Sequence, residues 1–398
     1  MPQHLPIAVV GGGPAGALAA SILARAQKRV LLFDEKLAWE KPCGGGVTHK
    51  ALKQYPFLAD AKIERAFQKH CELISPSGRR VRFHLRYPLA IFSRCTLNGL
   101  LLDRARNAGA EIRQQRVTRI EGSAGDWRLT TTAGEYSASH VVMAAGARNP
   151  FRAQFLSPIA PDDLMVTAGY FIPSRSALVQ IQFLKGISGY IWVFPRRDHV
   201  SAGIAAKMGE TTTASLRQRL EQWLADNNFS LAGARFYSHI LPALRTQTLD
   251  KIEVCGDGWS MVGDSAGLVD PITGEGLYYA LRSGELCAEA LLADCLPAYQ
   301  TKLEEEILPE LRLAARVSHR FYNGEVLGES VLERMVAFTQ QSENFRDLMR
   351  DLFAGIQGYR DLRSRLYRAL PSLMAEGLAG SLRLPWSGSG LATDPSSE

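Results

Sequence analysis

The sequence lacks several features that would assign it to a specialised class of protein. None of its hydrophobic runs approaches the roughly 18–20 residues that cross a bilayer. Its six cysteines form no Cys-x-x-Cys pair, so neither a zinc site nor a disulfide framework is predicted. The arginines are dispersed and the net charge of +6 is only mildly basic, which makes nucleic acid a poor partner. These absences favour an ordinary globular protein without a metal.

The start of the chain shows no secretory signal, because Met1–His4 runs directly into an apolar segment. We therefore expect a cytoplasmic protein, with at most loose contact to an anionic membrane surface through its basic charge. The 398 residues are 46% hydrophobic, which is enough for two or three packed units. We expect a monomer or a homodimer.

The strongest local pattern is an apolar strand, a glycine turn, a helix and a second strand that ends in an acid, over residues 7–34. In this context Gly11 permits a tight turn, Gly13 lets a pyrophosphate approach the backbone, and Gly16 lets helix and strand pack closely. Asp34 is placed to accept hydrogen bonds from a ribose, which favours FAD or NAD over NADP. The residues predicted to bind this end of a dinucleotide are Gly11, Gly13, Pro14, Ala15, Gly16, Asp34 and Glu35.

A second pattern follows at residues 261–276, where an apolar strand leads into Gly263-Asp264 and then Pro-x-x-Gly-x-Gly opens a helix. An aspartate at a strand end can hydrogen-bond sugar hydroxyls. The turn at Gly274 and Gly276 directs backbone N–H groups and the positive end of the following helix toward a bound group. A reduced flavin requires a site of this kind.

Together these two patterns resemble the FAD-binding module of the para-hydroxybenzoate hydroxylase fold. The resemblance implies that FAD is the cofactor, that Asp264 holds its ribityl or pyrophosphate region, and that the 274–276 turn faces the flavin. It further implies that Arg94 lies near the pyrophosphate and that Ala145 and Gly146 lie near the adenosine. Residues 147–152 lack the Asp-Gly pair of the aromatic hydroxylases.

The predicted fold is α/β, or α+β overall. It has a Rossmann-like, three-layer FAD-binding domain, an inserted antiparallel-sheet substrate domain and a C-terminal helical region. The pattern assigns 1–70, 95–155 and 250–295 to the FAD-binding domain, and 71–94 and 156–249 to the substrate domain. It assigns 297–380 to the helical region and predicts that 387–398 form a disordered tail.

A third pattern places Tyr190, Trp192 and Phe194 on one face of a strand that ends at Pro195. Taken alone, these aromatic residues fit either ordinary core packing or an apolar wall. Combined with the segment Lys41-Pro42-Cys43-Gly44-Gly45-Gly46, the strand resembles the geranylgeranyl reductase family, and the resemblance covers about residues 7–285.

That resemblance implies saturation of prenyl C=C bonds by hydride transfer from reduced FAD, on a lipid, quinone or diphosphate substrate. It implies catalytic roles for Cys43, Tyr190 and Trp192, and substrate binding by Tyr190, Trp192, Phe194 and Pro195. Cys43, which has an acidic proton, is the candidate proton donor or flavin-tuning group, although it also fits a small packing residue. Cys43, Gly44 and Gly45 are further expected to contact the cofactor.

Two other functions remain open at this stage. One is an oxygen-using monooxygenase or halogenase, because halogenases of this fold carry a similar Trp-x-Trp-x-Ile-Pro strand. The other is a non-catalytic flavin-binding or electron-relay protein. The sequence has no second glycine fingerprint, so the electron donor is expected to be external: NADPH, ferredoxin or a reductase.

Overall fold

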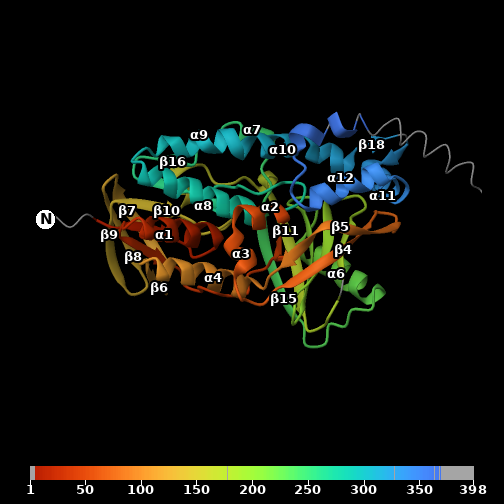
Figure 1. Ribbon diagram of the computed structural model, residues 1–398, viewed down its shortest axis with the longest axis horizontal. Coiled ribbons are helices and arrows are strands. Elements are labelled where there is room, and N and C mark those ends of the chain that lie inside the picture. The colour runs from red at the N-terminus through yellow and green to blue at the C-terminus, as the bar shows by residue number, and fades with distance from the viewer. Residues whose placement is uncertain (1–4, 177, 327, 363, 367, 369–398) are drawn as a thin grey trace, which may run out of the picture.

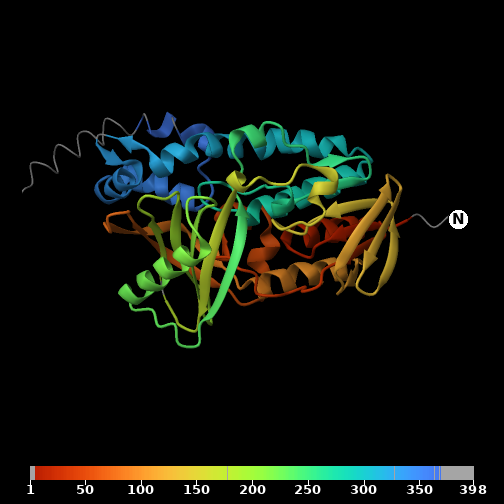
Figure 2. The same cartoon turned by 180° about the vertical axis from the view of Figure 1, so that it is seen from behind.

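A computed structural model describes residues 5–176, 178–326, 328–362, 364–366 and 368. Figure 1 shows an elongated molecule with the N-terminal strand and helix at one end and a large sheet at the other. Helices after residue 276 run along one long edge and connect the two ends, and Figure 2 shows the same arrangement from behind. The predicted fold class is confirmed. The predicted tail at 387–398 lies outside the described residues.

The dinucleotide-type layer is a sheet built from separate parts of the chain. Val30–Phe33, Ile7–Val10, His140–Met143 and Trp259–Met261 pair in parallel, each register directly aligned. These strands are buried on both faces and rich in Val, Leu and Met, as parallel strands require. In the described residues the order is β16 (Cys255–Gly256), β17 (Trp259–Met261), β10 (His140–Met143), β1 (Ile7–Val10), β2 (Val30–Phe33) and β6 (Glu111–Arg113).

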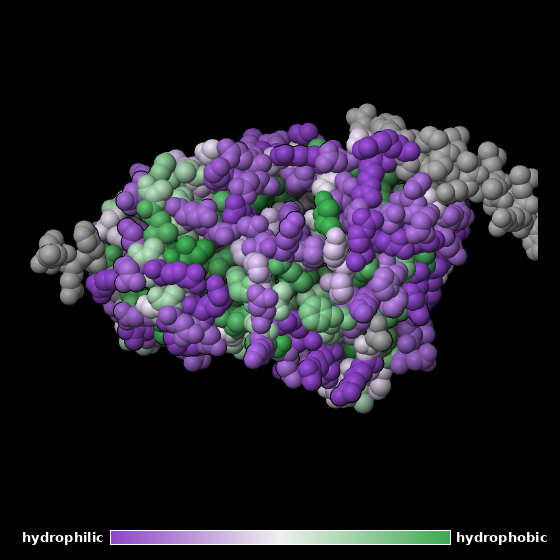
Figure 3. Space-filling view, in the orientation of Figure 1, coloured by the Kyte–Doolittle hydropathy of each residue, from purple (hydrophilic) through white to green (hydrophobic). Residues whose placement is uncertain are grey.

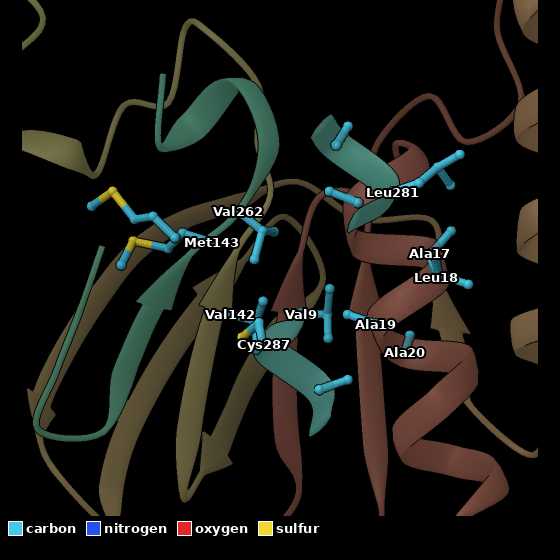
Figure 4. Packing of buried hydrophobic residues seen from close by; sticks show 14 of the residues in the cluster. Val9, Ala17, Leu18, Ala19, Ala20, Val142, Met143, Val262, Leu281 and Cys287 are labelled. Atoms are coloured by element: carbon cyan, nitrogen blue, oxygen red, sulfur yellow. The ribbon is translucent and has the colours of Figure 1, made fainter. Parts of the chain in front are cut away.

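Helices cover one face of this sheet and a small antiparallel sheet covers the other. Helix α1 (Pro14–Arg25) packs on α4 (Arg94–Asn107) and α8 (Leu277–Leu292). Val9 and Val142, which are register partners, lie on the helix side with Ala19 and Cys287 (Figure 4). On the opposite face the Phe33 ring meets Tyr136 edge-on at 4.9 Å. That small sheet consists of β7 (Val117–Ser123), β8 (Asp126–Thr131) and β9 (Gly134–Ala138).

The second large sheet is the one the sequence predicts as a substrate domain. All its pairings among the described residues are antiparallel except that of β12 with β4, which is parallel. Helix α6 (Thr213–Asp226) covers one face through Leu216 and Leu220. The strand order is β15 (Arg235–Pro242), β11 (Leu164–Ile172), β14 (Val200–Lys207), β13 (Gly189–Pro195), β12 (Val179–Phe183), β4 (Ala66–Ile74), β5 (Arg80–Ile91) and β3 (Gly46–Val47).

Some strand boundaries differ from the predicted ones. The sheet takes up Gly46–Val47 and Ala66–His70, from a range assigned to the FAD-binding domain. Strand β5 is continuous through Pro88, whereas the sequence pattern alone predicts separate strands at about 81–85 and 90–93. A register shift between Gln68 and His70 of β4 accommodates the extra residues of β5, as a β-bulge does. The division into domains itself remains a prediction.

Residues 297–353 are mainly helical, and the face that they present in Figure 3 is largely hydrophilic. Leu332, Val336 and Leu348 pack against the sheet residues Leu73 and Phe83, so this region closes over the second sheet. It also contains a short hairpin that the sequence does not predict. Its elements are α9 (Pro297–Glu306), α10 (Leu308–Asn323), β18 (Glu325–Val326), β19 (Glu329–Ser330), α11 (Val331–Gln341) and α12 (Glu343–Phe353).

The remaining short elements connect these parts. They are α2 (His49–Gln54), α3 (Pro56–Asp60), α5 (Arg152–Phe155), α7 (Thr246–Leu249) and the 3₁₀ turns Pro161–Asp163 and Gly263–Ser265. Over the described residues, no helix combines the length and the apolar character needed to cross a membrane.

Candidate active site

The glycine turn after β1 has the geometry that a close backbone approach requires. Gly11 has φ +113°, and a Cβ there would lie 2.2 Å from the carbonyl oxygen of Ala144. A Cβ at Gly16 would lie 2.0 Å from the carbonyl oxygen of Gly11. In contrast, a Cβ at Gly13 would meet nothing within 4 Å. The space ahead of the α1 N-terminus, where Pro14 is the first helical residue, is therefore open at Gly13.

Asp34 follows β2, as predicted, and its carboxylate organises the turn around it. Oδ2 accepts a hydrogen bond from Gly12 N at 2.7 Å, while Oδ1 accepts from Lys36 N at 2.8 Å and Leu37 N at 2.7 Å. A carboxylate has about four acceptor sites, so one stays available for a further donor. Glu35 is exposed and pairs with Arg116 at 3.8 Å. The ribose-binding roles of these two acids remain predictions.

A cluster of basic groups surrounds Asp264. Lys41 Nζ donates to Asp264 Oδ2 at 3.0 Å, across 223 residues of sequence. Burial alone would raise the pKa of the Asp264 carboxyl, but Lys41 and then Arg94 outweigh it, so that pKa is lowered. Burial, followed by Lys41, lowers the pKa of His239 to about 4, so its imidazole is neutral at pH 7. Arg148 also acts electrostatically on His239. This site is therefore positive overall.

Two buried polar atoms in this cluster have no hydrogen-bond partner among the described residues, namely Arg94 Nε and His239 Nε2. Unsatisfied buried polar groups are rare in native proteins, so each of them calls for a partner. With the open space at Gly13 and the positive end of α1, they fit the phosphates of a dinucleotide. Arg94 is held in place by Asn98, whose Oδ1 accepts from Arg94 Nη2 at 3.2 Å.

The other predicted cofactor residues converge on the same place. Gly146 has φ +78°, and its carbonyl oxygen accepts from Ser265 Oγ at 3.2 Å, so the loop after β10, which begins with Ala145, meets the turn after β17. A Cβ at Gly263 would lie 3.2 Å from the Cβ of Ala15 in α1. A Cβ at Gly276 would lie 3.4 Å from Asp264 Oδ1.

The segment 41–46, named the Cys43 segment below, lies against strand β13. A Cβ at Gly44 would be 3.1 Å from the Phe194 ring, and a Cβ at Gly46 would be 2.9 Å from it. Gly45 has φ +83°, and a Cβ there would be 2.1 Å from the carbonyl oxygen of Phe92. Glycines at positions 44 and 46 allow the backbone to lie directly on the Phe194 ring, and the glycine at 45 allows it to approach the Phe92 backbone.

Cys43 is half-buried and its backbone is fixed from the sheet side. The Cys43 carbonyl oxygen accepts from Arg196 Nη2 at 2.7 Å and from Ser201 Oγ at 2.9 Å. Arg196 is itself ion-paired with Glu40. The thiol sulfur accepts from Gly45 N at 3.3 Å. The Cys43 segment is thus a braced loop.

Tyr190 and Phe194 flank the more deeply buried Trp192 on the inner face of β13. Trp192 is only 7% exposed and covers Gly203 of the neighbouring strand, where a Cβ would lie 2.2 Å from the indole. The Tyr190 hydroxyl donates to the Thr273 carbonyl oxygen at 3.0 Å. Burial raises the pKa of Tyr190, so the hydroxyl keeps its proton for this bond. Pro195 is buried at the end of the strand.

The structure therefore brings three separate sequence patterns together. The Cys43 segment contacts Phe194, Tyr190 bonds the turn that precedes α8, and Lys41 pairs with Asp264. Sequence reasoning missed the contributions of Lys41, His239, Arg196 and Ser201. Lys41 stands inside a recognised motif, which was the one available signal. His239 and Ser201 lie on strands, and Arg196 directly follows β13, with nothing local to mark any of them.

Sequence reasoning also missed the support behind the 270–276 loop. Tyr359 OH donates to Asp270 Oδ2 at 2.9 Å, and Tyr322 OH donates to the Ile272 carbonyl oxygen at 2.6 Å. Thr48 Oγ1 donates to Glu275 Oε1 at 3.2 Å. Burial, and then the charge of Asp270, raises the pKa of Glu275 to about 7. The C-terminal region thus fixes the loop through Asp270 and Ile272.

Comparison with known proteins gives the class first. A family model described as FAD dependent oxidoreductase matches residues 50–285, and one for an NAD(P)-binding Rossmann-like domain matches residues 9–59. The fold and the cluster around Asp264 agree with that class, so the protein is an FAD-dependent oxidoreductase.

The family follows from a curated relative. Geranylgeranyl diphosphate reductase of Rhodobacter capsulatus is 30% identical over 307 residues, covering 72% of this chain and 74% of that protein. The chain belongs to the geranylgeranyl reductase family. A geranylgeranyl bacteriochlorophyll reductase-like structure from Thermoplasma acidophilum has a TM-score of 0.77 at 19% identity, covering 94% of this chain and 98% of that one. The flavin-dependent brominase Bmp2 has a TM-score of 0.70 at 17% identity, covering 93% and 100%, a likeness of fold alone.

Proposed function

We propose that this protein reduces C=C bonds of a prenyl chain, with the aromatic strand β13 and the Cys43 segment forming the reaction site. The single observation that carries the proposal is the contact between Gly44, Gly46 and the Phe194 ring. It joins the two sequence features whose combination carries the resemblance to this family. The family relative named a geranylgeranyl diphosphate reductase supports a prenyl substrate.

The chain's own residues account for most of what such a reaction needs. When bound, reduced FAD supplies a hydride to one alkene carbon, and the other carbon needs a proton. An isolated alkene has no carbonyl to polarise, so positioning and exclusion of water must do the work. Tyr190 and Phe194 offer an apolar surface for the chain, Trp192 supports them from the sheet, and Pro195 closes the strand. We assign the proton to Cys43 Sγ.

The residues around Asp264 would hold the cofactor in this scheme. Lys41, Arg94 and the α1 N-terminus would bind its phosphates, while Asp264 would bind the ribityl chain. The loop 270–276, fixed by Tyr190 and by the C-terminal tyrosines, would lie beside the flavin. The charge, burial and contacts of these residues support the proposed roles.

An anaerobic single-turnover experiment tests the reaction. The FAD-loaded protein is photoreduced and mixed with geranylgeranyl diphosphate, and flavin reoxidation is followed at its absorbance maximum. Reoxidation with a product heavier by two hydrogens per reduced bond supports the proposal. If the prenyl compound leaves the flavin reduced, while oxygen and an aromatic compound yield a hydroxylated or halogenated product, the proposal is wrong.

A second experiment tests Cys43. The variant Cys43→Ala should retain FAD but lose most of the reoxidation rate, because the proton source is gone. Cys295→Ala is the matched control, since Cys295 is an exposed cysteine of another region. Equal rates in the two variants would remove the role assigned to Cys43.

We further propose that the electrons come from an external donor, NADPH, ferredoxin or a reductase. For a lipid substrate, peripheral contact with an anionic membrane fits the basic net charge of +6. Either a monomer or a homodimer is compatible with the fold. Reduction of the flavin by each donor in turn, and sedimentation with anionic vesicles, distinguish these cases.

A further inference from the structure

A cavity of about 600 Å³ lies between the start of α4 and the edge of the second sheet. Ser93, Cys95 and Thr96 form its helix side, while Phe171 and residues 196–199 form its sheet side. The volume falls in the range of about 300–1,000 Å³ that small-molecule sites occupy. Arg196 lines this cavity and also donates a hydrogen bond to the Cys43 carbonyl oxygen, so the cavity adjoins the Cys43 segment.

Arginines give the cavity an excess of positive charge. Its lining includes Arg65, Arg196, Arg197 and Arg235 against the carboxylates of Glu40, Glu64 and Asp198. Burial, and then the charge of Arg196, lowers the pKa of His199, so this further lining residue does not neutralise a carboxylate at pH 7.

Two of these four arginines are already matched by carboxylates. Arg196 pairs with Glu40, and Arg197 pairs with Glu64 at 3.4 Å. The Asp198 carboxylate accepts from His199 Nδ1 at 2.8 Å.

The other two arginines have no carboxylate partner among the described residues. Arg65 is fixed by carbonyl oxygens, including that of Ala61 at 2.6 Å. The Arg235 guanidinium is exposed and lies over the Phe171 ring at 5.2 Å. Arginines without a carboxylate partner favour an anionic occupant.

The helix end adds to the same potential. Helix α4 has 14 residues, and its first turn begins at Arg94. Glu40 accepts from Arg94 N at 2.9 Å, which satisfies one of the free N–H groups. Cys95 and Thr96, the next residues of that turn, line the cavity and contribute the positive end of the helix dipole.

We propose that this cavity binds the phosphate groups of a phosphorylated reactant. Two reactants of the proposed reaction carry such groups: a prenyl diphosphate through its head group, and NADPH through its phosphates. Binding itself does not depend on the proposed reaction, whereas the choice between these two sources does. Through Arg196, an anion in the cavity would act directly on the support of Cys43.

Calorimetric titration of the oxidised, FAD-loaded protein tests this, because FAD already fills its own pyrophosphate site. Inorganic pyrophosphate, geranylgeranyl diphosphate and NADPH are titrated separately into wild type, Arg235→Ala, Arg235→Lys and Arg128→Ala. Arg128 is the matched control, an exposed arginine of the small sheet. Pyrophosphate should bind wild type and Arg128→Ala alike, at least tenfold more weakly to Arg235→Ala, and with intermediate affinity to Arg235→Lys.

The same data identify the source. If Arg235→Ala also loses affinity for geranylgeranyl diphosphate but not for NADPH, the cavity binds the substrate head group. If it loses affinity for NADPH but not for geranylgeranyl diphosphate, the cavity binds the reductant. The proposal is overturned if wild type does not bind pyrophosphate, or if Arg235→Ala binds all three compounds as tightly as Arg128→Ala. A protein that shows the pyrophosphate effect but never reduces an alkene keeps the cavity and loses only the proposed function.

Discussion

Adding one methyl group at Gly46 should weaken the contact between the Cys43 segment and strand β13. The new Cβ would lie 2.9 Å from Phe194 Cε1, so the ring must yield by about 0.5 Å to reach an ordinary separation of 3.4 Å. Overpacking of this kind costs about 1–3 kcal/mol. The backbone of Gly46 lies outside the left-handed region, so alanine can adopt it without strain. Alanine also lowers the conformational entropy of the unfolded chain, which stabilises the folded state by about 0.4–1 kcal/mol. With the midpoint of each range, the net expected loss is about 1.3 kcal/mol.

Urea unfolding of Gly46→Ala, followed by tryptophan fluorescence, measures this loss. Phe194→Leu removes the ring, so the double variant should be more stable than additivity predicts by about 1–2 kcal/mol. Gly99→Ala is the control. Gly99 lies within α4, and its new Cβ would meet only Ala38, at 3.8 Å. Alanine in place of glycine inside a helix stabilises by about 0.5–1 kcal/mol. Wild-type stability for Gly46→Ala, or strict additivity with Phe194→Leu, would refute the packing argument.

Three further predictions follow from the loops around the cofactor site. The folded-state pKa of Glu275, about 7, lies above its ordinary 4.5, so the wild-type protein should lose stability as pH rises from 4.5 to 8. Glu275→Gln cannot titrate, so urea unfolding should show it gaining about 2–3 kcal/mol relative to wild type over this interval. A difference between the two proteins that stays constant with pH would contradict this. Tyr359→Phe leaves the buried Asp270 carboxylate short of one donor and should cost about 1–3 kcal/mol, seen as a lower Tm; an unchanged Tm counts against the bond. Asp34→Ala removes three hydrogen bonds from the glycine turn and should raise the Kd for FAD at least tenfold by flavin fluorescence, whereas full flavin occupancy would disprove its importance.

The sequence predicts best where structure depends on neighbouring residues. The turn at Gly11–Gly16 and the acid at Asp34 are separated by few residues and belong to one strand–helix–strand unit. Their spacing therefore indicated the parallel layer directly. The alternation of Tyr190, Trp192 and Phe194 likewise predicted a shared face, because side chains in a strand alternate.

The sequence predicts least where distant segments decide the outcome. The ion pair of Lys41 with Asp264 spans 223 residues, and nothing near either residue marks the other as its partner. The sequence pattern indicated separate strands at 81–85 and 90–93, but the bulge opposite Gln68–His70 lets β5 continue through Pro88. The bonds of Tyr359 and Tyr322 to the 270–276 loop likewise depend on how the C-terminal helices dock.

The assembly of the parallel sheet has a consequence for how the chain folds during synthesis. Ile7 is paired with His140, and Val141 is in turn paired with Trp259. The first strand emerges from the ribosome early, yet one of its neighbours is synthesised much later and the next neighbour later still. Such long-range parallel pairing is slow and leaves apolar strand edges uncovered meanwhile. The cofactor site can therefore be completed only after residue 276 has been translated, and the nascent chain should depend on chaperones until then.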